Sequence, residues 1–227
     1  MDRVLFELFP YAAVAIALVE CVRRYLKDRF TYSSLSSQLL EGEDLFFGTV
    51  AWHYGIIILL IGHLLGFLLP EQLLAFNGAP LRLYILEVSA LVFGLAALTG
   101  IVSLGVRRAV RARIRAVTTP MDVVLLVLLI AQVGLGVYMA LTLRWGSNWF
   151  AVAMVPYLRS LCVLQPDSAL LSVLPLVVKL HVIGAFALVA ILPFSRLAHV
   201  LVVPWKYLWS RPQQVIWNKN PSRRWQR

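Results

Sequence analysis

Five long apolar stretches dominate the sequence and limit what the chain can fold into. They cover roughly residues 4–22, 45–69, 83–106, 121–143 and 170–203. A helix needs about 20 mostly apolar residues to cross a bilayer. In lipid every backbone N–H and C=O must be bonded within the protein, and a helix achieves this within one segment. The sequence therefore predicts an all-α integral membrane protein with five transmembrane helices. The last stretch contains Pro175 and Pro193, so we expect it to tilt, kink or project past the hydrocarbon.

The composition agrees with a membrane protein: 60% of residues are hydrophobic and 14% are charged, with a mean hydropathy of +0.80. The net charge of +10 is compatible with nucleic-acid binding, but the basic residues cluster between the apolar runs. We therefore predict the lipid bilayer as a partner and no nucleic acid. We expect residues 1–227 to form a single membrane domain, with the first stretch retained as a span rather than removed as a signal peptide.

The basic residues predict the orientation. Sixteen of the 21 Lys and Arg side chains fall on one side of the expected spans, mainly in 23–44, 107–120 and 204–227. The side richer in Lys and Arg is cytoplasmic by the positive-inside rule, which places the N-terminus in the periplasm and the C-terminus in the cytoplasm. The tail 204–227 also holds four tryptophans, a composition that favours contact with a protein on the cytoplasmic face.

Cysteine chemistry is excluded as the basis of function. The chain has two cysteines, Cys21 and Cys162, and no CxxC motif. Iron–sulfur clusters, cysteine-bound zinc and c-type haem attachment are therefore unsupported. The expected topology puts the two thiols on opposite membrane faces, so we predict that they do not form a disulfide.

The chain has four histidines, and all of them lie in the second and fifth apolar stretches: His53, His63, His181 and His199. An ionisable group within a bilayer is costly and usually functional. A single histidine there is readily explained by a hydrogen bond to a neighbouring helix. Four histidines confined to two helices, with none in any loop, favour a shared chemical role.

Their spacing limits that role. Helical rise separates His53 from His63 by about 15 Å and His181 from His199 by about 27 Å, so no helix can supply two ligands to one ion. Each of two sites must take one histidine from each helix. Zinc or copper normally has three or four protein ligands, whereas two imidazoles suit a six-coordinate haem b iron. The topology pairs His53 with His199 near the cytoplasm and His63 with His181 near the periplasm. The mismatch of about 12 Å between the rises requires tilt or bending at Pro193.

Other residues near the histidines have two readings each. A glycine can admit a flat macrocycle or simply allow close helix packing; four glycines lie nearby, Gly55, Gly62, Gly66 and Gly184. Arg196 and Lys179 precede histidines of the fifth stretch, where they can bind haem propionates or extend to the membrane interface as solvated cations.

The motifs HYGIIILLIGHLLG, RARIRAVTTPMD and LHVIGAFALVAILPFSRLAHV resemble the membrane cytochrome b (gamma) subunit of respiratory nitrate reductase. The spacings of the paired histidines and the five-span layout match that family, and the similarity extends from FPYAA near the start through SSQLL. The resemblance covers nearly the whole chain.

The resemblance implies a multi-pass subunit of an oxidoreductase in the prokaryotic cytoplasmic (inner) membrane. On this resemblance we expect it to bind two haem b groups, to oxidise menaquinol or ubiquinol on the periplasmic side, and to pass electrons to an iron–sulfur beta subunit. A molybdenum-containing alpha subunit then reduces nitrate. Carried over by position, the resemblance implies that His63 and His181 hold the distal haem, and that His53 and His199 hold the proximal one. Quinol lies by Gly62 and His63, with Arg82 where the family pattern has lysine.

Glu87 is a further departure from the family pattern. A carboxylate near the periplasmic side can accept a quinol proton as a general base, or it can be a buried group hydrogen-bonded to a neighbouring helix. Both readings stay open at this stage.

Two other functional classes remain open. A related dihaem cytochrome b anchors other oxidoreductase complexes, such as a hydrogenase, a formate dehydrogenase or a sulfite-linked enzyme. A non-redox membrane scaffold or transporter would instead use the histidines as proton relays. The subunits that co-purify with the chain would distinguish the first class from nitrate reductase. A reduced-minus-oxidised spectrum would distinguish the second class, which has no haem, from a cytochrome b.

Overall fold

A computed structural model describes residues 2–27 and 45–201, and within these ranges the chain is helical and contains no strand. Five helices are long and apolar enough to span a membrane: Val4–Lys27, Gly48–Leu68, Pro80–Val110, Pro120–Thr142 and Leu176–Phe194. This result confirms the predicted all-α fold with five candidate spans. The predictions for the connection 28–44 and the tail 204–227 lie outside the described residues.

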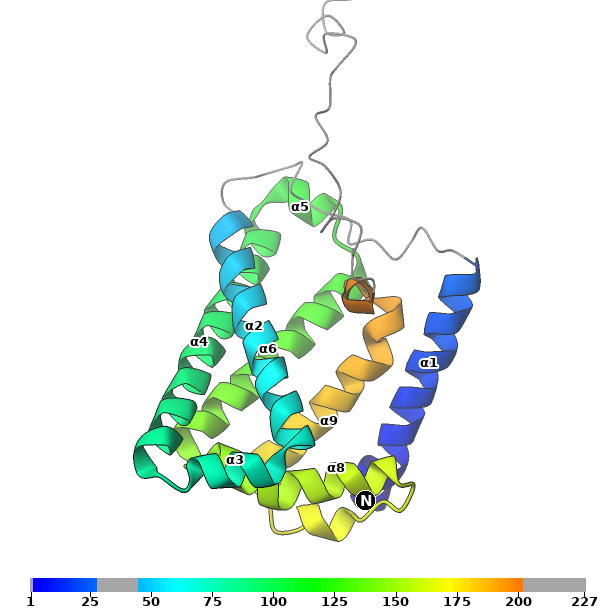
Figure 1. The fold of residues 1–227 in the computed structure, drawn as a ribbon. Helices are drawn as coiled ribbons and strands as arrows, with labels where there is room; N and C mark the ends of the chain where they lie inside the picture. Colours follow the sequence, from blue (N-terminus) through cyan, green and yellow to red (C-terminus); the bar gives the residue numbers. More distant parts are fainter. Residues whose placement is uncertain (1, 28–44, 202–227) are drawn as a thin grey trace, which may run out of the picture.

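The long helices pack against one another in a fixed order of neighbours. They are α1 (Phe9–Lys27, preceded by the π-helix η1, Val4–Leu8), α2 (Leu45–Leu68), α4 (Pro80–Val110), α6 (Pro120–Thr142) and α9 (Leu176–Ile191). α2 packs on α4, α4 on α6, α6 on α9, and α9 on α1, and α2 lies in front of α6 and α9 in the view of Figure 1. The two histidine-bearing elements, α2 and the fifth span, are therefore held in place mainly through α4 and α6.

Short helices cover the two ends of the bundle (Figure 1). α5 (Ala112–Ala116) lies at what we call the α5 end, where α4 ends and α6 begins. The opposite end, the α8 end, carries α3 (Pro70–Asn77), α7 (Gly146–Trp149), the π-helix η4 (Phe150–Met154), α8 (Val155–Cys162) and the 3-10 helix η5 (Ser168–Leu171). Cys21 and Cys162 form no disulfide, as predicted.

Prolines and one capping box define where several helices begin. α3, α4 and α6 each have proline in the first turn, where its missing N–H would have had no helical partner in any case. At the start of α6 the Thr119 side chain accepts a hydrogen bond from the Asp122 N–H, and the Asp122 carboxylate accepts one from the Thr119 N–H. This reciprocal capping box satisfies two N–H groups that the helix leaves without partners.

The fifth candidate span, Leu176–Phe194, is shorter than the stretch 170–203 that the sequence predicts. α9 begins at Leu176 after Pro175, and regular α-helix stops at Ile191. Two 3-10 segments follow, η6 (Leu192–Phe194) and η7 (Arg196–Leu201). Pro193 lies in η6, where a proline ring prevents an α-helix from continuing. The expected bend at Pro193 is confirmed, but the rise calculated for one continuous α-helix between His181 and His199 is wrong.

Glycines bring α2 and α4 into close contact. A Cβ atom on Gly55 would lie 2.7 Å from the carbonyl oxygen of Phe93, and one on Gly100 would lie 2.8 Å from the carbonyl oxygen of Gly48. The adjoining core consists of Trp52, Ala97, Ile101, Val133 and Val137. Of the two readings given for Gly55, helix packing is therefore the one that the structure supports.

Candidate functional site

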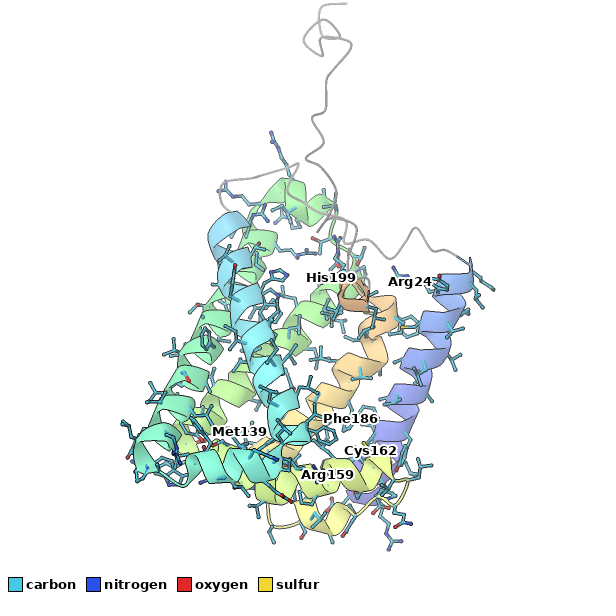
Figure 2. All side chains as sticks on the ribbon, in the orientation of Figure 1. Arg24, Met139, Arg159, Cys162, Phe186 and His199 are labelled. Carbon is cyan, nitrogen blue, oxygen red and sulfur yellow. The ribbon has the colours of Figure 1, made fainter. Side chains whose placement is uncertain are left out.

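Residues far apart in the sequence bring two histidines together near the α5 end. His53 comes from α2 and His199 from η7, and their ring centres are 6.4 Å apart with 64° between the ring planes. Figure 2 shows His199 at the α5 end of the fifth span. Both side chains are half-buried. We call these two residues the α5-end pair.

Three of the four imidazoles are oriented by a backbone carbonyl. Nδ1 lies 2.8 Å from the Thr49 oxygen in His53, 2.7 Å from the Leu59 oxygen in His63, and 2.6 Å from the Arg196 oxygen in His199. A carbonyl oxygen can only accept a hydrogen bond, so each Nδ1 must carry the proton. The other nitrogen, Nε2, then has a free lone pair, which is the form in which histidine binds a metal.

The other two histidines form the α8-end pair. His63 of α2 and His181 of α9 are close enough to interact electrostatically. The His181 ring packs against Gly136 of α6, where an added Cβ would lie 3.3 Å from His181 Cε1. Nδ1 of His181 is buried and has no hydrogen-bond partner. A buried polar atom without a partner indicates a group that would gain from an added ligand or water.

Phe150 adds an aromatic wall to this pair. Its ring packs edge-on against the His63 imidazole, with 5.6 Å between ring centres. A Cβ on Gly66 would lie 3.0 Å from the Phe150 ring, so Gly66 makes room for that ring. A Cβ on Gly62 would meet nothing within 4 Å. The structure therefore has open space beside Gly62, whereas Gly66 is in contact with Phe150.

Gln132 of α6 connects directly to the backbone beside His181. Its Nε2 donates a hydrogen bond of 3.0 Å to the carbonyl oxygen of His181. Its Oε1 lies so close to Gly184 that a side chain at this position would require Gln132 to shift, and this oxygen has no hydrogen-bond partner. Gly184 is therefore explained by contact with Gln132.

Arg82 and Glu87 each bind a short helix at the α8 end. The Arg82 guanidinium donates to the carbonyl oxygens of Phe76 (2.7 Å) and Ala75 (3.1 Å), at the C-terminal end of α3. The position suits a cation, because carbonyl groups at a helix C-terminus carry partial negative charge. Arg82 and Glu87 do not form an ion pair with each other.

Glu87 accepts two hydrogen bonds at the start of α7. Its Oε1 lies 2.8 Å from the Ser147 N–H nitrogen and 2.6 Å from Ser147 Oγ. Asn77 of α3, which is buried, donates to Ser147 Oγ and to Asn148 Oδ1 at 2.9 and 2.7 Å. The carboxylate is thus hydrogen-bonded to a neighbouring segment, as one of its two predicted readings requires, and α7 leads directly into Phe150.

Arg196 and Lys179 have partners in the protein. The Arg196 guanidinium binds the Asp122 carboxylate through Nε at 2.6 Å and Nη2 at 3.1 Å. Arg108 of α4 binds the same carboxylate at 3.1 Å. Lys179 donates to the carbonyl oxygen of Ser172 at 3.3 Å.

The sequence reasoning missed three residues of these surroundings, namely Asp122, Gln132 and Phe150. A usable signal existed for the first two, since they are the only acid and the only amide in the apolar stretch 121–143, and polar residues in a span are usually functional or paired. Phe150 gave no such signal. No group of three or more His, Cys, Asp or Glu side chains that could hold a metal ion occurs in 2–27 or 45–201.

The fold and these contacts describe a helical protein with five candidate membrane spans, in which a histidine of the second span lies against a histidine of the fifth. The chain belongs to the nitrate reductase gamma subunit family, whose model matches residues 2–218. It is therefore a membrane subunit of the nitrate reductase type.

Individual relatives agree with this assignment. The chain is 33% identical over 210 residues to the nitrate reductase gamma chain of Bacillus subtilis, covering 91% of this chain and 94% of that one. It is 28% identical to the respiratory nitrate reductase 1 gamma chain of Escherichia coli, covering 95% and 97%. It is also 30% identical to the nitrate reductase-like protein NarX of Mycobacterium tuberculosis, where the match covers 92% of this chain but 33% of the relative.

Proposed function

We propose that the chain is the quinol-oxidising dihaem cytochrome b subunit of a membrane-bound nitrate reductase. The observation that carries the proposal is the α5-end pair, in which two imidazoles from different spans face each other with their Nδ1 atoms bound to carbonyl oxygens. The names of the relatives favour nitrate reductase over hydrogenase, formate dehydrogenase or sulfite-linked complexes as the parent enzyme.

The spacing of the α5-end pair supports a role in which His53 and His199 would hold one haem iron between them. Metal–imidazole bonds are about 2 Å long and the ring centre lies about 1 Å beyond the nitrogen, so two opposed imidazoles on one ion have centres about 6 Å apart. The observed 6.4 Å is close to this separation. Each pair offers two neutral nitrogen ligands, which suit haem iron better than zinc or copper.

In this proposal His53 and His199 hold one haem b, and His63 and His181 hold the other. Bound b haems supply reversible one-electron chemistry, and one near each end of the bundle gives electrons a path across the membrane. Arg196 and Lys179 are proposed propionate contacts.

Quinol is proposed to bind at the α8 end, next to Gly62 and His63. Open space beside Gly62 supports an approach at this position. Oxidation converts quinol to quinone and releases two electrons and two protons. Arg82 would orient the quinol oxygen as a hydrogen-bond donor, and Glu87 would accept a proton as a general base.

The distribution of charge supports an orientation with the α8 end in the periplasm. Of the described residues, nine Lys and Arg lie toward the α5 end and five toward the α8 end. By the positive-inside rule, the α5 end faces the cytoplasm. The iron–sulfur beta subunit and the molybdenum-containing alpha subunit are then proposed to dock on that side.

The test is a set of reduced-minus-oxidised spectra of the purified chain. We expect two b-type centres in the natural protein, loss of one in His199→Ala, and loss of the other in His181→Ala. Tyr54→Phe is the control, because Tyr54 neighbours His53 in sequence but its side chain is exposed. Absence of any b-type absorption band would refute the proposal. Isolation in mild detergent with subunit identification tests the partners.

A further inference from the structure

Asp122 is a buried carboxylate that joins three elements near the α5 end. Its side chain is 6% exposed. It accepts two hydrogen bonds from Arg196 of η7 and one from the Thr119 N–H at the start of its own helix, and it forms an ion pair with Arg108 at the end of α4. A carboxylate that accepts from both Nε and Nη2 of an arginine fixes the position of that guanidinium.

The same arginine determines where His199 lies. The carbonyl oxygen of Arg196 accepts the hydrogen bond from His199 Nδ1 at 2.6 Å. The side chain of Arg196 is therefore fixed by Asp122, while its main chain orients the imidazole that faces His53. η7 is a 3-10 segment beyond the bend at Pro193. Its position is therefore not determined by continuation of the α9 helix.

We propose that Asp122 is a positioning residue for the α5-end pair, holding η7 through Arg196 so that His199 faces His53. The proposal rests on the proposed haem-ligand role of that pair. Residues that orient metal ligands through hydrogen bonds affect metal affinity although they do not touch the metal. Asp122 contacts Arg196 rather than His199, so it acts on the imidazole through Arg196.

The main test is the haem content and the difference spectrum of Asp122→Asn. The amide keeps the size of the side chain and can still accept the cap hydrogen bond, but it loses the charge that binds two arginines. We call the haem of the α5-end pair the α5-end centre and the haem of the α8-end pair the α8-end centre. We expect the α5-end centre to be bound about 10- to 100-fold more weakly, and the α8-end centre to keep its spectrum and midpoint potential. The two centres are assigned from the His199→Ala and His181→Ala spectra.

Arg196→Lys is the second variant, because it keeps the positive charge and loses the two-point contact. It should change the spectrum or midpoint potential of the α5-end centre in the same direction as Asp122→Asn. Asp122→Glu keeps the carboxylate and a residue type suited to a capping box, so it should restore the centre partly or fully. These variants keep the proposal testable if Asp122→Asn does not fold.

Two controls separate positioning from general stability. Thr119→Ala removes the side-chain half of the capping box and leaves the Asp122 contacts with arginine in place. Glu20→Gln removes an ion pair with Arg23 in α1 that does not involve Asp122. Both should retain two centres with natural spectra. The proposal is overturned if Thr119→Ala reproduces the effect of Asp122→Asn, or if Asp122→Asn leaves the α5-end centre unchanged in a chain that binds both haems. Absence of both centres in the natural chain would overturn the proposed function as well.

Discussion

The two histidine pairs are held in place by different kinds of contact. At the α5 end, His199 lies on a 3-10 segment that a buried carboxylate ties to α4 and α6 through two arginines. At the α8 end, His181 lies within regular α-helix and packs on Gly136, while His63 packs on Phe150. The position of the α5-end pair depends on charged side chains, and the position of the α8-end pair depends mainly on packing.

This difference follows from where each pair lies along the fifth span. Pro193 ends the α-helix before His199, so the backbone beyond it needs another restraint. His181 comes five residues after the start of α9 at Leu176 and is positioned by the helix itself. Variants at the two ends should therefore affect one pair at a time, and the predictions below test that independence.

The largest effect is expected from Gly100→Val, where α2 and α4 touch. A side chain at this position would overlap the backbone of Gly48 and Trp52, and Trp52 precedes His53. Overpacking typically costs about 1–3 kcal/mol and displaces backbone. We expect a large fall in the free energy of unfolding and loss of the α5-end centre first, measured by denaturant titration and difference spectra.

Gly134→Ala is the matched control, because an added Cβ in that part of α6 meets nothing within 4 Å. Alanine has the higher helix propensity, so its stability should equal or exceed that of the natural chain by up to about 1 kcal/mol. Simultaneous and equal loss of both centres in Gly100→Val would contradict the independence of the two ends.

A second effect is expected from Glu87 and separates its two proposed roles. Glu87→Gln can still accept hydrogen bonds from Ser147 but cannot act as a base. We expect it to lower kcat for quinol oxidation by about tenfold or more without changing the haem spectra. Glu87→Ala also releases the start of α7, so it should lower kcat further and alter the α8-end centre. Steady-state kinetics over a range of pH, with both spectra, checks this.

A Glu87→Gln variant with natural turnover at every pH would remove Glu87 from the proton chemistry. Glu87 would then keep only its contact with Ser147, and the α8 end would be organised by hydrogen bonding as well as by packing.

Much of the fold could be predicted from the sequence because it depends on local composition. Apolar run length located the five spans, and Pro193 indicated the bend. The position of η7 was not predictable in this way, because it depends on Arg196 meeting Asp122, 74 residues away in the chain. The role of Gly55 also could not be decided from the sequence, because the spacing of residues along a helix does not reveal which neighbouring helix a glycine faces. Its contact with α4 decides it.

The α8 end was the least predictable region. The short helices α3, α7 and α8 are too brief to produce a clear periodic pattern, so the sequence reasoning treated them as connections. The contacts that place Phe150 on His63 and Ser147 on Glu87 join residues 87 and 60 positions apart. Such pairings arise from how the helices pack and leave no local signature.

A smaller effect is expected from Phe150→Leu, which removes the aromatic contact with His63. An aromatic pair contributes about 0.5–1.5 kcal/mol beyond its buried area. We expect a shift in the spectrum of the α8-end centre and a few-fold rise in the KM for quinol, with the α5-end centre unchanged. Val152→Ala, at an exposed position of the same η4 segment, should change neither. A shift of the α5-end centre would show that the two pairs are coupled.

The smallest effect is expected from Tyr157→Phe in α8. The Tyr157 hydroxyl is buried and donates to the carbonyl oxygen of Phe6 at 2.8 Å, so its removal should cost about 1 kcal/mol. Burial, followed by the nearby Tyr11 and Glu7, raises the pKa of Tyr157 above its ordinary value of 10.0.

The raised pKa sets the sign of a pH dependence. The folded state keeps the Tyr157 phenol protonated where the unfolded chain ionises, so its contribution to stability is complete below about pH 10 and declines above it. The difference in unfolding free energy between the natural chain and Tyr157→Phe should therefore narrow between pH 8 and pH 11, as denaturant titrations at the two pH values would measure. The spectrum of the α5-end centre should be identical in both proteins. A difference that stays constant with pH would mean that Tyr157 has the same pKa in the folded and unfolded states.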